Sequence, residues 1–253
     1  MPLIHFIGGE KGGVGKSVVS RLLAQYYIDR KRPFSAFDAD LSHGAMLRYY
    51  ADFTTAIDPT DFESLDQLAE SAVESGNDAI VDLAAQTARP INAWMEASGF
   101  PEMGKELGLE VVLWHVMDDG YDSQRLLGET LKKHAKNFRY VVVRNHGRGA
   151  DFEPFNKSGE CKWAQRFGAE FIDLPALTPS TMSKIDRRSA SFWAAVNGLN
   201  NEGKALLSLM ERQRVKTWIT QVYQAFDQLL APKAEPKQEK PRKPDSPTHP
   251  GYY

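Results

Sequence analysis

Short apolar runs alternate with longer segments of helical periodicity along most of the chain. Six runs predict strands, at about 3–8, 34–38, 79–84, 110–116, 140–145 and 170–174. Six segments with an i, i+3, i+4 rhythm predict helices, at about 17–30, 61–75, 88–98, 122–136, 180–196 and 202–230. Strands that are apolar almost throughout are typical of a parallel sheet covered on both faces. The pattern therefore predicts an α/β fold with a three-layer, doubly wound, mostly parallel sheet.

The pattern changes after residue 230. Residues 231–253 are rich in proline and lysine and have no apolar rhythm. Such a segment cannot bury enough apolar surface to offset the entropy lost on ordering. We therefore expect one domain over residues 1–230, followed by a disordered C-terminal tail over residues 231–253.

Composition narrows the class of protein. The 253 residues carry a formal net charge of -2, whereas a constitutive nucleic-acid binder is usually more basic. The single cysteine, Cys161, excludes an intramolecular disulfide and suits a reducing compartment. The N-terminus shows neither a basic leader nor a cleavage site, and no apolar run approaches the roughly 20 residues that span a bilayer. We expect a cytoplasmic protein without membrane insertion.

A glycine-rich stretch, GGEKGGVGKSVVS at residues 8–20, separates the first predicted strand from the first predicted helix. Backbone N–H groups of such a turn bind phosphate oxygens, and the following helix N-terminus adds partial positive charge. Lys16 is expected to reach the β- and γ-phosphates, and Ser17 to bind Mg²⁺. The generic pattern G-x-x-x-x-G-K-[ST] fails at its first position, where this chain has Glu10.

The pattern that does match is K-G-G-x-G-K-[ST], and it resembles the deviant phosphate-binding loop of the ParA/MinD family of ATPases. The first position of the generic pattern varies in that family, so Glu10 does not count against it. The resemblance implies a P-loop NTPase fold, ATP and Mg²⁺ as cofactors, and a nucleotide-binding loop of Lys11, Gly12, Gly13, Val14, Gly15, Lys16 and Ser17. The opening IHFIGGEKGGVGKS, with LLAQYY behind it, looks most like the TraL/MobD type of plasmid mobilisation and conjugal transfer ATPase.

Three carboxylates match further motifs of the family. FDADLS follows the second predicted strand and supplies Asp38, expected beside the metal, and Asp40, expected to orient the attacking water. A helix-capping role is the alternative for this pair. Asp82 lies near the end of the third predicted strand and is expected to hold Mg²⁺ through a water molecule. The switch II loop that follows, LAAQT, lacks the prolines that are common there in the family.

Base recognition is expected from two later residues. Asn145 ends a predicted strand at the place where the family contacts the adenine amino edge, and a turn-capping role is its alternative. Pro175 lies in a stretch that resembles the family's loop over the base. GTPases need an aspartate three residues after the asparagine, where this chain has Arg148, so we expect ATP as the nucleotide.

Lys11 is the residue from which the resemblance predicts how the protein functions. In the family this signature lysine reaches into the site of a second subunit, so that ATP lies between two facing copies. The resemblance therefore implies an ATP-dependent homodimer, with Lys11, Lys16 and Asp40 as catalytic residues. The expected protein is a slow ATPase whose product is a change of association state, and which acts in plasmid mobilisation or conjugation, in DNA partition or in cargo positioning.

The sequence offers several candidate partners and competing functions. Non-specific DNA is one candidate partner, through Lys184, Arg187 and Arg188 or through Arg212, Arg214 and Lys216, although such clusters are more often solvated helix faces. A DNA-bound or transfer-apparatus protein is another. The alternative function is an ATP-dependent enzyme of the dethiobiotin synthetase type, which phosphorylates a carboxylate. A nucleotide kinase would need an arginine-rich lid, for which RNHGRG is a poor match.

Overall fold

The computed structural model describes residues 1–231 except 42–43, 135–136 and 201, so the predicted tail beyond its first residue lies outside the described part. Seven strands form one sheet in the order β3-β2-β4-β1-β5-β6-β7, and every neighbouring pair is parallel. The strands are β1 (Leu3–Gly8), β2 (Phe34–Asp38), β3 (Thr54–Ala56), β4 (Asp78–Asp82), β5 (Glu110–Met117), β6 (Arg139–Asn145) and β7 (Glu170–Leu174). The predicted α/β class is confirmed, with a fully parallel sheet.

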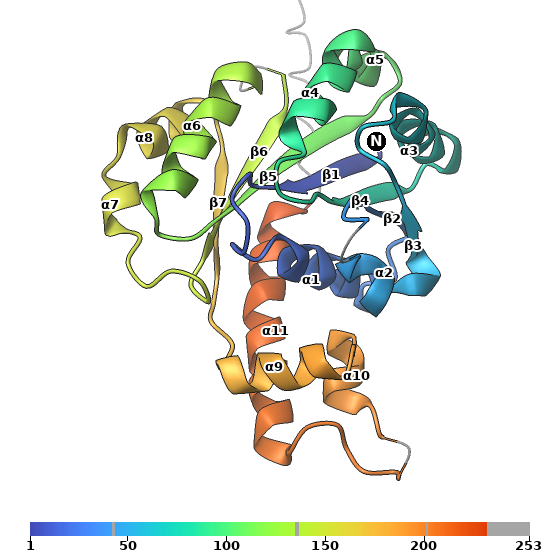
Figure 1. The fold of residues 1–253 in the computed structure, drawn as a ribbon, viewed down its shortest axis with the longest axis vertical. Coiled ribbons are helices and arrows are strands. Elements are labelled where there is room, and N and C mark those ends of the chain that lie inside the picture. Colours follow the sequence, from blue (N-terminus) through green and yellow to red (C-terminus); the bar gives the residue numbers. More distant parts are fainter. Residues whose placement is uncertain (42–43, 135–136, 201, 232–253) are drawn as a thin grey trace, which may run out of the picture.

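Helices cover both faces of this sheet (Figure 1). One face packs against α1, α10 and α11, and the other against α3, α4 and α5 at one side and α6 and α8 at the other. The helices are α1 (Lys16–Asp29), α2 (Ala45–Tyr49), η1 (Ala51–Phe53), α3 (Phe62–Ser75), α4 (Ala88–Ala97), α5 (Phe100–Glu106), α6 (Tyr121–His134), α7 (Glu153–Asn156), α8 (Gly159–Arg166), α9 (Pro179–Arg187), α10 (Phe192–Asn197) and α11 (Leu209–Leu229). In the described part of the chain, no helix has the length and apolar character that crossing a membrane requires.

The central strand β1 shows why its sequence forms a buried strand. Ile4 and Phe6 face the layer of α3 to α5, whereas Ile7 faces α1 and α11, and all three are fully buried or nearly so. Alternating side chains therefore supply both cores from a single strand. Burying each of these large apolar side chains contributes roughly 1.5–3 kcal/mol to folding.

Several element boundaries differ from the predicted ones. The predicted helix at 180–196 is two helices, because the chain turns at Ser189 with a positive φ of 48° before Ser191 caps α10. The last helix begins at Leu209, where Ser208 and Glu211 form a capping box. The three-residue strand β3, at the sheet edge, is too short to produce a periodic signal.

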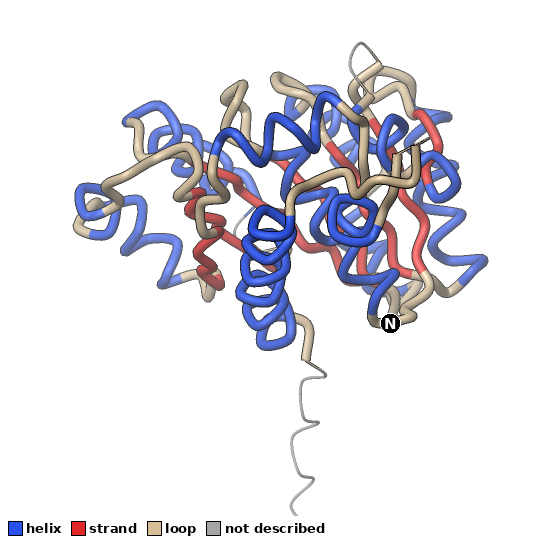
Figure 2. The backbone as a smooth tube through the Cα atoms, turned by 90° about the horizontal axis from the view of Figure 1, so that it is seen from below, coloured by secondary structure: helices blue, strands red, loops and turns tan. Residues whose placement is uncertain are grey.

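The parallel topology brings the carboxyl ends of all seven strands to one edge of the sheet. The order reverses around β1, which lies between β4 and β5, and ligands of open α/β sheets bind at such a switch point. Asp38 at the end of β2 lies opposite Asp82 at the end of β4, and Asp82 in turn lies opposite Ile7 of β1. The fold therefore places the predicted phosphate loop and two predicted metal-site carboxylates together. Figure 2 shows the sheet between its helical layers from a second direction.

A chain of buried polar side chains crosses the core beneath this edge. The indole N–H of Trp114 donates to Nδ1 of His5 (3.1 Å), and Nε2 of His5 contacts the Tyr27 hydroxyl (3.0 Å). That hydroxyl lies 2.7 Å from a carboxylate oxygen of Asp78, to which it donates. Burial lowers the pKa of His5 to about 3, so its ring is neutral and carries its proton on Nε2. Within this series the His5 ring and the Tyr27 hydroxyl each have a hydrogen-bond partner on both sides, and Asp78 at its end also accepts from Arg32 and from the N–H of Leu3.

We predict that Tyr27→Phe lowers the free energy of unfolding by about 1–3 kcal/mol, because it leaves the buried Nε2–H of His5 without an acceptor. Urea denaturation at pH 7 measures this. The matched control is Tyr223→Phe, which removes a more exposed hydroxyl bonded to Asp29 and should cost less than about 1 kcal/mol. Equal losses in the two variants would contradict the prediction.

Candidate functional site

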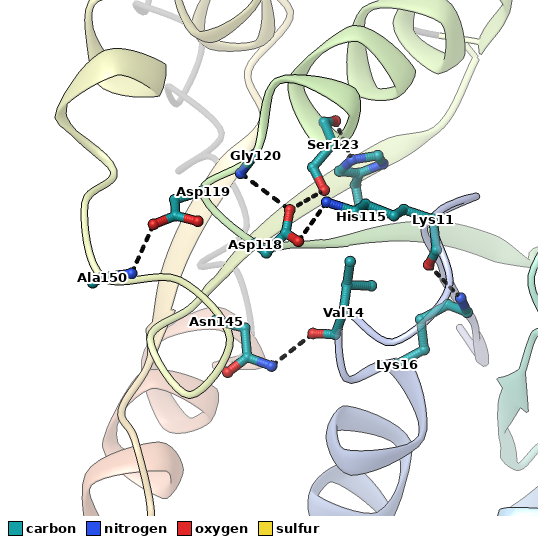
Figure 3. Close-up of polar contacts among 10 residues, drawn as sticks. All are labelled: Lys11, Val14, Lys16, His115, Asp118, Asp119, Gly120, Ser123, Asn145 and Ala150. Carbon is teal, nitrogen blue, oxygen red and sulfur yellow. Dashed lines mark hydrogen bonds and ion pairs between the residues drawn. The ribbon is translucent and has the colours of Figure 1, made fainter.

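The loop after β1 has the backbone conformation of a phosphate cradle. Gly15 has a φ of 101° and precedes α1, whose N-terminus faces the loop. A Cβ atom at Gly15 would lie 2.3 Å from the side-chain nitrogen of Asn145. Only glycine therefore fits both the backbone angle and the neighbouring side chain at this position. The side-chain amide of Asn145 donates to the carbonyl of Val14 (2.7 Å), which fixes the loop against the end of β6 (Figure 3).

Lys16 lies folded back under the loop. Its side chain is largely buried, and Nζ donates to the carbonyl of Lys11 (3.0 Å). Burial lowers the pKa of Lys16, and this lowering is opposed by the negative charges of Asp82, Glu10 and Asp40. These three carboxylates therefore lie close enough to act on the ammonium group. A cation held inside the loop in this way is available to phosphate oxygens.

Asp82 and Ser17 fit a site for a divalent cation. One carboxylate oxygen of Asp82 accepts from the Ser20 hydroxyl (2.9 Å), and the other is buried with no hydrogen-bond partner among the described residues. Burial raises the pKa of Asp82 to about 7, and Ser17 lies near enough to lower it. An unpaired buried carboxylate oxygen beside a hydroxyl is a donor set that suits Mg²⁺. Within the described residues no cluster of three or more His, Cys, Asp or Glu forms a metal site, so phosphate and water would supply the other ligands.

Asp38 has the hydrogen bonds of a capping residue. One of its oxygens accepts from the N–H of Asp40 (3.0 Å), and the other accepts from the first turn of α2, at Met46 (2.8 Å) and Leu47 (3.1 Å). Burial raises the pKa of Asp38, while these three backbone bonds lower it. This is the geometry of the capping alternative. Asp38 thus positions Asp40 and α2 next to Asp82, and a direct role at the metal stays a prediction.

Lys11 is held by an acid that the sequence analysis did not single out. Its Nζ lies 2.6 Å from Asp118, the first residue after β5, and its side chain is about one third exposed. Asp118 also accepts from the Ser123 hydroxyl (2.6 Å) and from the N–H of Gly120 (3.1 Å) (Figure 3). Burial raises the pKa of Asp118, but these hydrogen bonds outweigh it, so the pKa lies below its ordinary value. The signal available in the sequence was its place just after a predicted strand.

The two predicted base-contacting residues line one pocket. Asn145 and Pro175 border a pocket of about 340 Å³ beside α1, together with Arg148, Met182 and Trp218. Trp218 donates its indole N–H to the carbonyl of Pro175 (2.6 Å), which fixes the loop after β7. Pockets of this size accept drug-sized ligands such as a base with its ribose. The amide of Asn145 bonds to Val14, and its carbonyl oxygen accepts from Gly147 (2.9 Å), so base contact by Asn145 stays a prediction.

One of the two basic clusters is partly neutralised. Lys184 of α9 pairs with Glu211 of α11 at 2.5 Å, and Nε of Arg187 donates to the carbonyl of Ser183 (3.3 Å). Lys184 is therefore less available to an external anion than its sequence position indicated. Contact with DNA through either cluster stays a prediction.

Comparisons with known proteins give relatives of one type. The chain is 26% identical to protein MobD of Acidithiobacillus ferrooxidans over 84% of its own length and 95% of MobD. It is 26% identical to a protein TraL of Escherichia coli over 88% of its length and 96% of TraL. The structure of the MinD cell division protein of Aquifex aeolicus matches 86% of this chain and 98% of that chain, with a TM-score of 0.47 and 16% identity. No protein-family model matches the chain.

The motif, the parallel fold and the MobD and TraL similarity support a ParA/MinD-like family. The resemblance to the TraL/MobD type, predicted from the first 27 residues, is thereby confirmed. The residues of the ParA/MinD-like motif are contiguous in the fold: Lys11 to Gly15 lie in the turn after β1, and Lys16 and Ser17 begin α1.

We predict that Asp82 makes the stability of the ligand-free protein fall as pH rises. Its pKa of about 7 in the folded state exceeds the ordinary value of 3.8, so between about pH 4 and pH 7 the native state binds the extra proton. Asp82→Asn removes the cost of a buried negative charge at high pH. The free energy of unfolding of the variant, relative to wild type, should therefore be higher at pH 8 than at pH 5 by at least about 1 kcal/mol. Urea denaturation in the presence of EDTA measures the difference.

The matched control is Asp122→Asn, which changes an exposed carboxylate on α6. It should alter stability little, and equally at the two pH values. A pH-independent effect of Asp82→Asn would contradict the assignment of the titration to Asp82.

Proposed function

We propose that this protein is a slow, Mg²⁺-dependent ATPase that switches between monomer and dimer, with ATP between two facing subunits. The observation that carries the proposal is the placement of Lys11. Its ammonium group is not folded under its own loop as that of Lys16 is, but lies partly exposed against Asp118. A cation in that place can be offered to the phosphate of a second subunit.

The residues of one subunit would divide the work as follows. The loop N–H groups and Lys16 bind the β- and γ-phosphates, and Ser17 with Asp82 would hold Mg²⁺, whose charge would neutralise the phosphates. Asp40, positioned by its backbone bond to Asp38, would orient the attacking water. The pocket beside Asn145 and Pro175 would receive adenine and ribose.

Dimerisation in this proposal exchanges one partner of Lys11 for another. In the single subunit Asp118 neutralises Lys11 at 2.6 Å. In the dimer the γ-phosphate bound to the other subunit would replace Asp118. The γ-phosphate is lost on hydrolysis, so Lys11 would return to Asp118 and the dimer would loosen.

The biological role proposed from the MobD and TraL similarity is plasmid mobilisation or conjugal transfer. The dimer would act on DNA, on a DNA-bound protein or on a component of a transfer apparatus. The exposed arginines Arg188, at the end of α9, and Arg214, in α11, are the side chains on which DNA contact would be tested first.

We predict that Asp40→Ala forms a stable dimer with ATP and Mg²⁺, because ATP binds but is not hydrolysed. Lys11→Ala should bind ATP with an affinity within about threefold of wild type, yet remain monomeric and lose turnover by at least about tenfold. Analytical ultracentrifugation with and without ATP, together with phosphate release, measures both. Lys162→Ala, which removes an exposed lysine of α8, is the control.

A monomeric Asp40→Ala protein at saturating ATP, or full turnover by Lys11→Ala, would contradict the proposed switch. Turnover that requires a small carboxylic acid would instead favour the dethiobiotin synthetase type of enzyme.

We also predict that Asp118→Asn lowers the ATP concentration needed for dimerisation by about two- to fivefold. The change removes the charge that competes for Lys11 but keeps an acceptor for Ser123 and Gly120, and a partly exposed ion pair is worth roughly 0.2–1 kcal/mol. ATP titrations followed by sedimentation measure the shift. Asp119→Asn is the control, because Asp119 accepts from Ala150 and Asp151 rather than from Lys11. An unchanged or raised ATP requirement in Asp118→Asn would contradict the exchange.

A further inference from the structure

Glu10, the residue that breaks the generic phosphate-loop pattern, makes a long-range contact. Its Oε1 accepts from the backbone N–H of Ala88 (2.9 Å), the first residue of α4. Thr87 precedes α4 at the capping position, and within the described residues its side chain caps no helix N–H. Its hydroxyl instead donates to the carbonyl of Ala84 (2.9 Å). The start of α4 is therefore capped by a carboxylate from the phosphate loop.

The segment 83–87, which connects Asp82 to α4, is hydrogen-bonded at one end to β1 and at the other end to the phosphate loop that follows β1. At one end the N–H of Leu83 donates to the carbonyl of Ile7 (3.1 Å). At the other end Ala88 donates to Glu10. Between them Gln86 adopts a φ of 65°, which is uncommon for a residue with a side chain. A tightly turned segment is thus held by the two residues that flank Gly8 and Gly9.

The position of Glu10 is set by a close approach of the backbone. Gly9 has a φ of 130°, and a Cβ atom there would lie 2.6 Å from the carbonyl oxygen of Val116 on β5. A side chain at residue 9 would therefore block this path of the loop, along which Glu10 reaches the start of α4. The charge of Glu10 also acts on Lys16, the lysine expected to bind phosphate.

We infer that Glu10 is a positioning residue that ties segment 83–87 and α4 to the phosphate loop. Through Glu10, the ordering of the loop that accompanies phosphate binding at Lys16 is passed on to the segment that follows Asp82. Glycine, which the generic pattern requires at this position, could not make this link. The transmission step rests on the proposed binding of ATP, whereas the tether itself is a property of the ligand-free protein.

Hydrogen exchange of peptides covering residues 83–97 tests the tether without nucleotide. Glu10→Ala removes the cap and should speed exchange at the start of α4 about fivefold. Glu10→Gln keeps an acceptor oxygen and should stay closer to wild type than to Glu10→Ala. Glu102→Ala, which removes an exposed first-turn glutamate of the neighbouring α5, should leave this peptide unchanged. Peptides from β5 report whether each variant is folded.

The same measurement with ATP and Mg²⁺ tests the transmission. Wild type should gain protection in both the loop peptide, residues 9–20, and the peptide 83–97. Glu10→Ala should keep the first gain and lose at least half of the second.

Three results would overturn the inference: wild-type exchange of residues 83–97 in ligand-free Glu10→Ala, equal exchange in Glu10→Gln and Glu10→Ala, or full ATP protection of residues 83–97 in Glu10→Ala. If ATP protects neither peptide in wild type, the proposed ATPase function fails, while the ligand-free comparison still decides the tether.

Discussion

The buried carboxylate of Asp82 is the constraint around which the rest of the site is arranged. A negative charge in a protein interior is costly unless it is paired, and one oxygen of Asp82 has no partner among the described residues. The parallel sheet puts this group there, because β4 ends beside β1 and Asp38 of β2 lies opposite it. The surrounding Ser20, Ser17 and Lys16 lower its pKa, yet burial keeps it near 7. The fold thus buries a carboxylate that is incompletely paired, and a bound cation would compensate its negative charge.

The two lysines of the loop differ in what surrounds them, although they are five residues apart. Lys16 is enclosed and directed to its own loop, whereas Lys11 lies at the surface against an acid from another strand. The ion pair with Asp118 has a small desolvation cost and a small net stability, because both side chains keep contact with water. An ion pair of this strength can be exchanged for a phosphate without a large barrier. A buried ion pair would hold Lys11 more firmly, so the partial exposure of this pair favours the proposed exchange of Asp118 for a phosphate.

Six of the seven strands, the layers and the phosphate loop were predictable from sequence, because each produces a local signal, whereas the three-residue strand β3 does not. Continuous apolar runs mark the strands, and the seven-residue motif fixes the loop between β1 and α1. Asp82 and Asp38 were predictable as strand-end carboxylates. Their bonding was not, since the three N–H groups that bond to Asp38 come from its own turn and from α2. Asp118 was missed because its meaning depends on β5 lying beside β1, which a single sequence does not display.

Glu10 is a second residue whose long-range contact could not be predicted from the sequence. In the sequence it was a departure from a generic pattern, and its only consequence was to favour the deviant family. In the structure it has a defined partner 78 residues away, at the start of a helix whose own capping residue bonds elsewhere. A glycine at that position would remove the bond to Ala88 and leave the one between Leu83 and Ile7 of β1. The departure therefore adds a second attachment between the phosphate loop and the segment that follows the buried carboxylate. The loop and that segment are in this way constrained to move together.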